Sequence, residues 1–170
     1  TFDPDRRRLY LAMSDVTGSM GTQSVINHID VASNRCGVVY ALDVAPLVDE
    51  NGDLVSEYAA QNIYPLVSGV EMSYPSDSPY AGNGCSVNGI ANPDNLTYLP
   101  GYDTLVIGED TSRHQNDAMW SMNVVDRKLT RIFTTPYGSE TTSPYWFPDV
   151  NGHGYLMAVI QHPYGESDQG

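Results

Sequence analysis

One pattern occurs three times along the chain: an aromatic residue, one further residue, a proline, a polar turn and then an apolar segment. The three copies begin at Phe2-Asp3-Pro4, Tyr98-Leu99-Pro100 and Trp146-Phe147-Pro148, so their prolines lie 96 and 48 residues apart. A period near 48 residues is typical of the β-propeller, in which a four-stranded sheet recurs about every 40 to 50 residues. The doubled first interval predicts one such unit plus a long insertion at about residues 44–92.

Short segments rich in β-branched and aromatic residues alternate with Gly, Pro, Asp and Asn along the whole chain. The middle copy of the repeat predicts four strands, at residues 95–98, 104–108, 118–125 and 129–134. Only residues 25–32 and 56–64 have a weak helical pattern. With 15 Gly and 11 Pro as breakers, the chain is predicted to be all-β.

The repeat favours a partial β-propeller domain over residues 1–170, with about three to four blades in this chain. A β-sandwich is the alternative fold. Because three units do not close a propeller, the remainder is expected from an upstream segment or from another chain.

Acidic residues dominate the charge: 21 Asp and Glu stand against 8 Lys and Arg, a formal net charge of −13. Such a chain repels nucleic acid and anionic membranes, and we expect no nucleic-acid partner. No apolar run approaches the roughly 18 to 20 residues that cross a bilayer, so no membrane span is expected. The acidity is explained either by solubility in an extracellular or halotolerant protein, or by bound cations that neutralise some of the carboxylates.

Three carboxylates flank two of the predicted strands. Asp94 lies in the polar turn Asn92-Pro93-Asp94-Asn95 before one strand, and Glu109 and Asp110 end the next. Carboxylates gathered at one edge of a sheet are how an oxygen-rich metal site is built. The repeat nevertheless puts Asp94 before the first strand of a unit and Glu109-Asp110 after the second, so the two groups need not share an ion. Glu140, one repeat onward, is the expected companion of Asp94, whose alternative role is to cap its own turn.

The candidate catalytic residue is His162, which follows the last apolar segment. Glu166 is a further candidate metal ligand. A histidine at the end of a strand can bind a metal or a phosphate group, although the adjacent Pro163 and Gly165 also suit a simple turn. His28, His114 and His153 have no partner pattern and are expected at the surface.

Two cysteines, Cys36 and Cys85, are too few and too widely spaced for a zinc site. They form either one disulfide in an oxidising compartment or two buried thiols. Because each lies beside a glycine in a polar segment, the disulfide is favoured.

Four segments, taken in order, resemble the C-terminal part of PhoX-type alkaline phosphatases. They are Thr1 to Ser14; Asn92-Pro93-Asp94-Asn95-Leu96 with Ile107-Gly108-Glu109-Asp110; Thr134-Thr135-Pro136-Tyr137-Gly138-Ser139-Glu140-Thr141-Thr142-Ser143-Pro144; and Val159-Ile160-Gln161-His162-Pro163-Tyr164-Gly165-Glu166. The resemblance implies a six-bladed β-propeller with iron and calcium in its central channel, which hydrolyses phosphate monoesters and is secreted or periplasmic.

By this resemblance Asp94 and Glu140 are metal ligands, and Glu109 and Asp110 provide a further carboxylate. The family's iron-binding cysteine, several acidic iron ligands and its phosphate-binding arginine would lie before Thr1, so this chain alone is expected to be inactive. Two hypotheses follow. In the first, the chain is a segment of a metal-dependent phosphatase and contributes metal ligands and part of the channel wall. In the second, it belongs to a non-catalytic, calcium-stabilised extracellular propeller used for binding or assembly.

Overall fold

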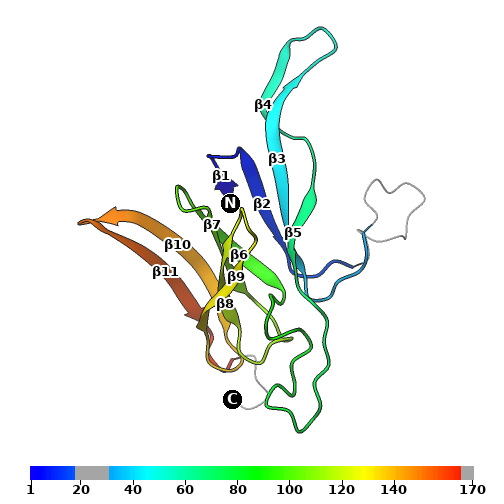
Figure 1. Ribbon diagram of the computed structural model, residues 1–170, viewed down its shortest axis with the longest axis vertical. Coiled ribbons are helices and arrows are strands. Elements are labelled where there is room, and N and C mark those ends of the chain that lie inside the picture. The colour runs from blue at the N-terminus through cyan, green and yellow to red at the C-terminus, as the bar shows by residue number, and fades with distance from the viewer. Residues whose placement is uncertain (18–30, 166–170) are drawn as a thin grey trace.

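The computed structural model describes residues 1–17 and 31–165. These residues form eleven strands and no helix, arranged in three antiparallel sheets (Figure 1). The all-β prediction is therefore confirmed. The described residues do not form a closed sheet or a complete propeller. They also contain no helix long and apolar enough to cross a membrane.

The first sheet contains β1 (Phe2–Asp3), β2 (Arg8–Met13), β3 (Val38–Val48), β4 (Leu54–Ala60) and β5 (Tyr64–Ser68). One edge of β3 pairs with β2, while its other edge pairs with β5 along its first half and with β4 along its second half. The weak helical pattern at residues 56–64 was misleading, because backbone pairing with β3 places most of that segment in β4. Of the other such segment, residues 25–30 lie outside the described part of the chain.

The second sheet is a meander of β6 (Pro93–Leu99), β7 (Thr104–Glu109), β8 (Ala118–Asn123) and β9 (Leu129–Thr134), paired in that order. These are the four strands predicted for the middle copy of the repeat, with bounds that differ by at most two residues. The third sheet is a hairpin of β10 (Glu140–Val150) and β11 (His153–Gln161), which forms a separate arm beside β6–β9 in Figure 1.

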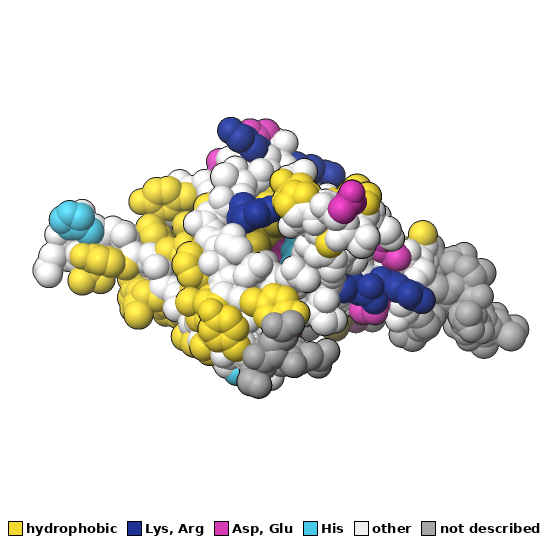
Figure 2. Space-filling view, turned by 90° about the horizontal axis from the view of Figure 1, so that it is seen from below, with side chains coloured by type: hydrophobic (Ala, Val, Ile, Leu, Met, Phe, Trp, Pro, Cys, Tyr) yellow, Lys and Arg dark blue, Asp and Glu magenta, His cyan; other side chains and the backbone are white. Residues whose placement is uncertain are grey.

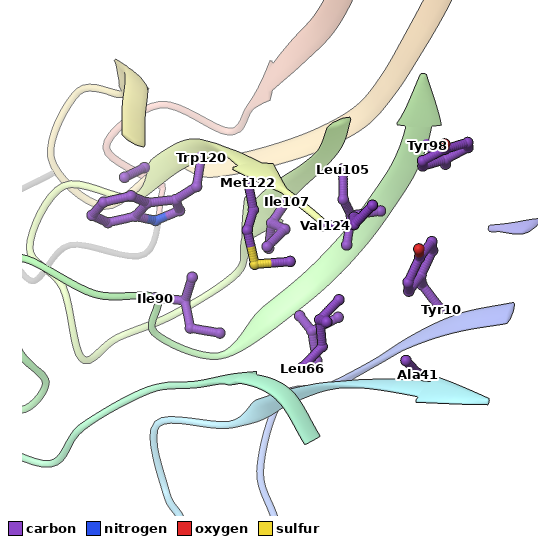
Figure 3. Packing of buried hydrophobic residues seen from close by; sticks show 12 residues of the cluster. Tyr10, Ala41, Leu66, Ile90, Tyr98, Leu105, Ile107, Trp120, Met122 and Val124 are labelled. Carbon is purple, nitrogen blue, oxygen red and sulfur yellow. The ribbon is translucent and has the colours of Figure 1, made fainter. Parts of the chain in front are cut away.

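The main core lies between the first and second sheets (Figure 3). Tyr10, Val39, Ala41 and Leu66 from the first sheet pack against apolar side chains of the second sheet: Tyr98, Leu105, Ile107, Ala118, Trp120 and Met122. Alternate residues of β7 and β8 point into this layer, as strand geometry requires. Burial of apolar surface is what joins the two sheets into one body.

A disulfide joins Cys36, which lies just before β3, to Cys85 in the long loop between β5 and β6. The Cα atoms of the two cysteines are 5.9 Å apart, within the range that the bond requires. Of the two alternatives drawn from the sequence, the structure shows the disulfide, and the chain has no free cysteine.

Candidate metal site

Three carboxylates converge where β6 begins, β7 ends and β10 begins. Asp94 lies in β6, Asp110 directly follows β7, and Glu140 is the first residue of β10. One carboxylate oxygen of each lies within 4.8 Å of the other two. Glu140 is buried, whereas Asp94 and Asp110 are exposed, so the cluster opens to solvent on one side.

Strand pairing brings Asp94 to Asp110. Pro93 pairs with Glu109, the last residue of β7, and the register then shifts between Pro93 and Leu96. This irregularity takes Asp94 out of the regular ladder, and such bulges redirect side chains at the ends of strands. The Asp110 amide also donates a hydrogen bond to the carbonyl of Asn92 (3.2 Å), whose φ of 39° turns the chain into β6.

A close contact between β7 and β10 brings in Glu140. The Thr141 hydroxyl accepts a hydrogen bond from the Glu109 amide (2.6 Å) and donates one to the Glu109 carbonyl (3.0 Å). Gly108 permits this approach, because a Cβ atom there would lie only 2.8 Å from the Thr141 carbonyl oxygen. The neighbours of Glu109 and Thr141, namely Asp110 and Glu140, are thereby held side by side.

The charges of the cluster act on Glu140. Burial, and then the nearby carboxylates of Asp110 and Asp94, raise the pKa of Glu140. His162 opposes them by lowering that pKa, and its Nε2 atom lies 3.4 Å from Glu140 Oε2. Three carboxylates at this spacing repel one another when ionised, and a bound cation would relieve that repulsion.

The donor set suits a hard cation. Calcium takes about six to eight oxygen ligands, and three carboxylates open to water provide oxygen donors of this kind. Cys36 and Cys85 are bonded to each other and offer no thiolate, so the described residues suit a metal with oxygen ligands better than one that needs a sulfur ligand. The amide oxygen of the nearby Asn92 is a further oxygen donor by type, but it already accepts a hydrogen bond from the Thr111 hydroxyl.

Glu109 lies outside this cluster, although its neighbour Asp110 belongs to it. Its fully buried carboxylate receives two donors on each oxygen. Oε1 accepts from Ala91 N (2.8 Å) and Trp120 Nε1 (2.6 Å). Oε2 accepts from Ala118 N (2.8 Å) and lies 2.9 Å from His114 Nδ1. In the structure Glu109 therefore joins the long loop to β7 and β8.

The prediction that His114 lies at the surface is wrong. His114 is 5% exposed, and its Nε2 atom lies 3.1 Å from the carbonyl oxygen of Ser86. The sequence contained a weak signal for this pairing, since Glu109 and His114 flank one short polar loop. His153 is exposed, as predicted. His28 and the candidate ligand Glu166 lie outside the described residues.

The structure thus brings together Asp94, Asp110 and Glu140, and it places His162 beside Glu140. A comparison of the chain with protein-family models, curated proteins and solved structures finds no significant match.

Proposed function

We propose that this chain is a segment of a metal-dependent phosphatase that hydrolyses phosphate monoesters, in which Asp94, Asp110 and Glu140 hold a calcium ion. The observation that carries the proposal is the convergence of these three carboxylates within 4.8 Å, with His162 beside them.

The chemistry of a phosphate monoester fits such a site. The ester is a dianion, and a bound cation supplies Lewis acidity and neutralises charge on the phosphoryl oxygens. Asp94 and Asp110 hold the cation on the exposed side of the cluster, where a substrate can approach. His162, with Nε2 at the rim of the cluster, is placed to carry a proton to or from an oxygen of the ester.

The strand order supports a β-propeller as the architecture. The first sheet has five strands, of which β1, β2, β3 and β5 follow one another across the sheet, while β4 pairs with the second half of β3. The second sheet has the four-stranded order β6-β7-β8-β9, and the hairpin β10–β11 follows it. In this proposal they are about three blades of a six-bladed propeller, and the remainder supplies the iron ligands. The disulfide supports a secreted or periplasmic location, because such bonds persist in oxidising compartments.

A second candidate is a non-catalytic propeller stabilised by calcium and used for extracellular binding or assembly. The position of the cluster favours this role as well, because Asp94 lies in the second sheet, Asp110 directly follows a strand of that sheet, and Glu140 belongs to the third sheet. One ion would cross-link the two sheets without any catalysis.

The two candidates are separated by assaying a polypeptide that carries the whole propeller on p-nitrophenyl phosphate, with calcium and iron present. In the phosphatase, chelation and Asp94→Asn each abolish turnover, while Asp77→Asn, at an exposed loop residue, leaves it unchanged. In the structural propeller, Asp94→Asn lowers only the thermal stability and its calcium dependence. Absence of turnover in the metal-loaded protein would overturn the phosphatase proposal.

A further inference from the structure

A polar pocket of about 240 Å³ lies between the long loop that joins β5 to β6 and the strands β8 and β9. Polar and aromatic residues form most of its lining, among them Tyr80, Asn83, His114, Gln115, Asn116 and Arg131. In Figure 2, which views the molecule from below, a histidine side chain is visible inside a hollow near the middle of this face, with a basic side chain beside it. The pocket shares no residue with the three carboxylates of the candidate metal site.

Arg131 brings a permanent positive charge to this pocket. It lies directly opposite Trp120 in the β8–β9 pair, and the register shifts between Met119 and Trp120, an irregularity of the kind that redirects side chains. The central carbon of the Arg131 guanidinium lies over the Trp120 ring, 5.0 Å from its centre, and one guanidinium nitrogen donates a hydrogen bond to the Val87 carbonyl. Because the Trp120 Nε1 atom is itself fixed by Glu109 (2.6 Å), the guanidinium rests on a rigid base.

The charge of Arg131 has no carboxylate beside it within the described part of the chain. Arg6 and Arg8 form ion pairs with aspartates, whereas Arg131 forms none with any described residue. No Asp or Glu is among the described residues that line the pocket, although the chain contains 21 of them. A guanidinium has five N–H donors, and the bond to Val87 uses one nitrogen. Arg131 therefore presents a charge and donors that a bound anion can use.

Hydrogen bonds within the chain hold the walls of the pocket. Asn83 accepts one from the Gln115 backbone amide (2.9 Å) and donates one to the Tyr80 carbonyl (2.8 Å). The Asn116 side chain donates one to the Thr135 carbonyl (3.0 Å). Because these contacts fix the backbone around the pocket, a ligand binds without having to order a loop, which favours its affinity.

Two side-chain amides remain for a ligand. The Gln115 amide group forms no hydrogen bond within the described residues, and the Asn116 amide oxygen is an acceptor that the bond to the neighbouring carbonyl leaves unused. Each amide can serve the hydroxyl groups of a ligand. His114, in contrast, has both ring nitrogens engaged (2.9 and 3.1 Å) and contributes only the surface of its ring. Tyr80, which is 50% exposed, adds an aromatic ring.

These groups suit a small hydroxy acid. A guanidinium binds a carboxylate through two parallel hydrogen bonds, and a single guanidinium in a chain of net charge −13 suits a monoanion better than a phosphate dianion. An amino acid does not fit, because its ammonium group would have no carboxylate partner among the described lining residues. The volume lies just below the range of about 300 to 1,000 Å³ that is usual for drug-sized ligands, so it suits a molecule of the size of one sugar.

We propose that this pocket binds a hydroxylated monocarboxylate of the size of one sugar, the class to which uronic acids belong. The carboxylate pairs with Arg131, the hydroxyl groups bond to the side-chain amides of Gln115 and Asn116, and the sugar ring lies against Tyr80. This inference depends on the pocket alone and requires neither the proposed metal ion nor the proposed phosphatase activity.

The test uses D-glucuronate as the probe and the full chain in metal-free buffer, so that calcium cannot bridge the probe to the carboxylate cluster. An NMR titration of the isotope-labelled chain should shift the amide signals of Gln115, Asn116 and Arg131 until they saturate. We expect a dissociation constant on the order of 1 mM, which is ordinary for a ligand of about 13 non-hydrogen atoms. D-Glucose, which lacks the carboxylate, and inorganic phosphate, which lacks the hydroxylated ring, should each bind at least about 10-fold more weakly. Glucose or phosphate that binds as tightly as glucuronate would overturn the proposal.

Three variants complete the experiment. Arg131→Gln should weaken glucuronate binding by at least about 10-fold, and Arg131→Lys, which keeps the charge but loses the planar fork, by about 5-fold. Arg127→Gln removes the same charge from an exposed residue between β8 and β9 and should leave the affinity unchanged. Parent-like affinity in Arg131→Gln would overturn the proposal, as would an equal loss in Arg127→Gln, which would assign the binding to bulk charge. The comparison of glucuronate with glucose needs only the parent chain, so it decides the matter even if Arg131→Gln does not fold.

Discussion

At the scale of single residues, Glu109 and Asp110 show how neighbours acquire different roles. Successive side chains of a strand point to opposite sides, so Glu109 enters the interior while Asp110 leaves the strand towards Asp94. The sequence predicted acids at this place, but it did not distinguish the two, because only the fold reveals which one meets the four interior donors.

Replacement of Glu109 by glutamine tests its interior role. The amide group of glutamine would turn a donor towards donors that now point at a carboxylate oxygen, and buried unsatisfied groups cost about 1 to 3 kcal/mol each. We expect Glu109→Gln to lower the free energy of unfolding by about 3 kcal/mol, measured by urea denaturation. The exposed residue Glu50 provides the control, and a loss no greater than that of Glu50→Gln would contradict the role.

Gly108 tests how the metal site is assembled. A Cβ atom there would lie 2.8 Å from the Thr141 carbonyl oxygen, so Gly108→Ala must move β10 away from β7. The shift separates Glu140 from Asp110, and calorimetry should show calcium affinity reduced by about 10-fold or more, a loss of about 1.4 kcal/mol. Gly101→Ala is the control for a general loss of stability. Gly101 has a φ of +79°, which disfavours alanine, but it has open space around it, so no neighbouring strand has to move. Unchanged calcium affinity in Gly108→Ala would contradict this assembly.

Tyr98 makes stability depend on alkaline pH. Burial and then the negative charge of Asp3 raise the pKa of Tyr98 to about 12. Because the folded-state pKa is raised, the contribution to stability is complete below the ordinary tyrosine pKa near 10 and is lost as pH rises through 12. Thermal midpoints should fall between pH 10 and 12, and Tyr98→Phe should flatten that fall. Tyr102→Phe, at an exposed tyrosine, should leave it unchanged.

At the scale of elements, the strands of the second sheet were predictable and the contact between sheets was not. Turn residues and apolar alternation define β6 to β9, and short connections make neighbours in sequence neighbours in the sheet. The approach of β10 to β7 depends on one threonine hydroxyl and one glycine, and neither has a recognisable pattern in the sequence. The repeat predicted Glu140 as the companion of Asp94, and Glu109 and Asp110 were further candidates. Only the structure shows that Asp110 joins the other two carboxylates and that Glu109 does not.

The disulfide secures the long loop between β5 and β6. The loop presents the Ser86 carbonyl to His114 and the Ala91 amide to Glu109, and Cys85 lies beside Ser86. With a separation of 49 residues, chain entropy assigns the bond about 4 kcal/mol of stability. The double variant Cys36→Ala, Cys85→Ala should lose a comparable free energy of unfolding and become insensitive to reductant. An unfolding free energy that reductant leaves unchanged in the parent chain would contradict this role.

At the scale of the whole molecule, the net charge of −13 should make the stability of the folded chain depend on the cation concentration. Asp94 and Asp110 lie at the ends of strands in the second sheet, and Glu140 begins a strand of the third, so a cation held by all three would stabilise the folded chain. The gain in the free energy of unfolding depends on the ratio of the cation concentration to the dissociation constant, and it is about 2.7 kcal/mol at a 100-fold excess. Thermal midpoints measured across a calcium titration should rise and return to baseline with chelator.

Asp110→Asn should abolish the rise, yet raise the midpoint in chelator, because Asp110 is one of the charges that disfavour ionised Glu140. Asp77→Asn removes a charge elsewhere on the surface and should preserve the calcium response. If Asp77→Asn and Asp110→Asn weaken that response equally, calcium acts through bulk charge and the three carboxylates are not its site.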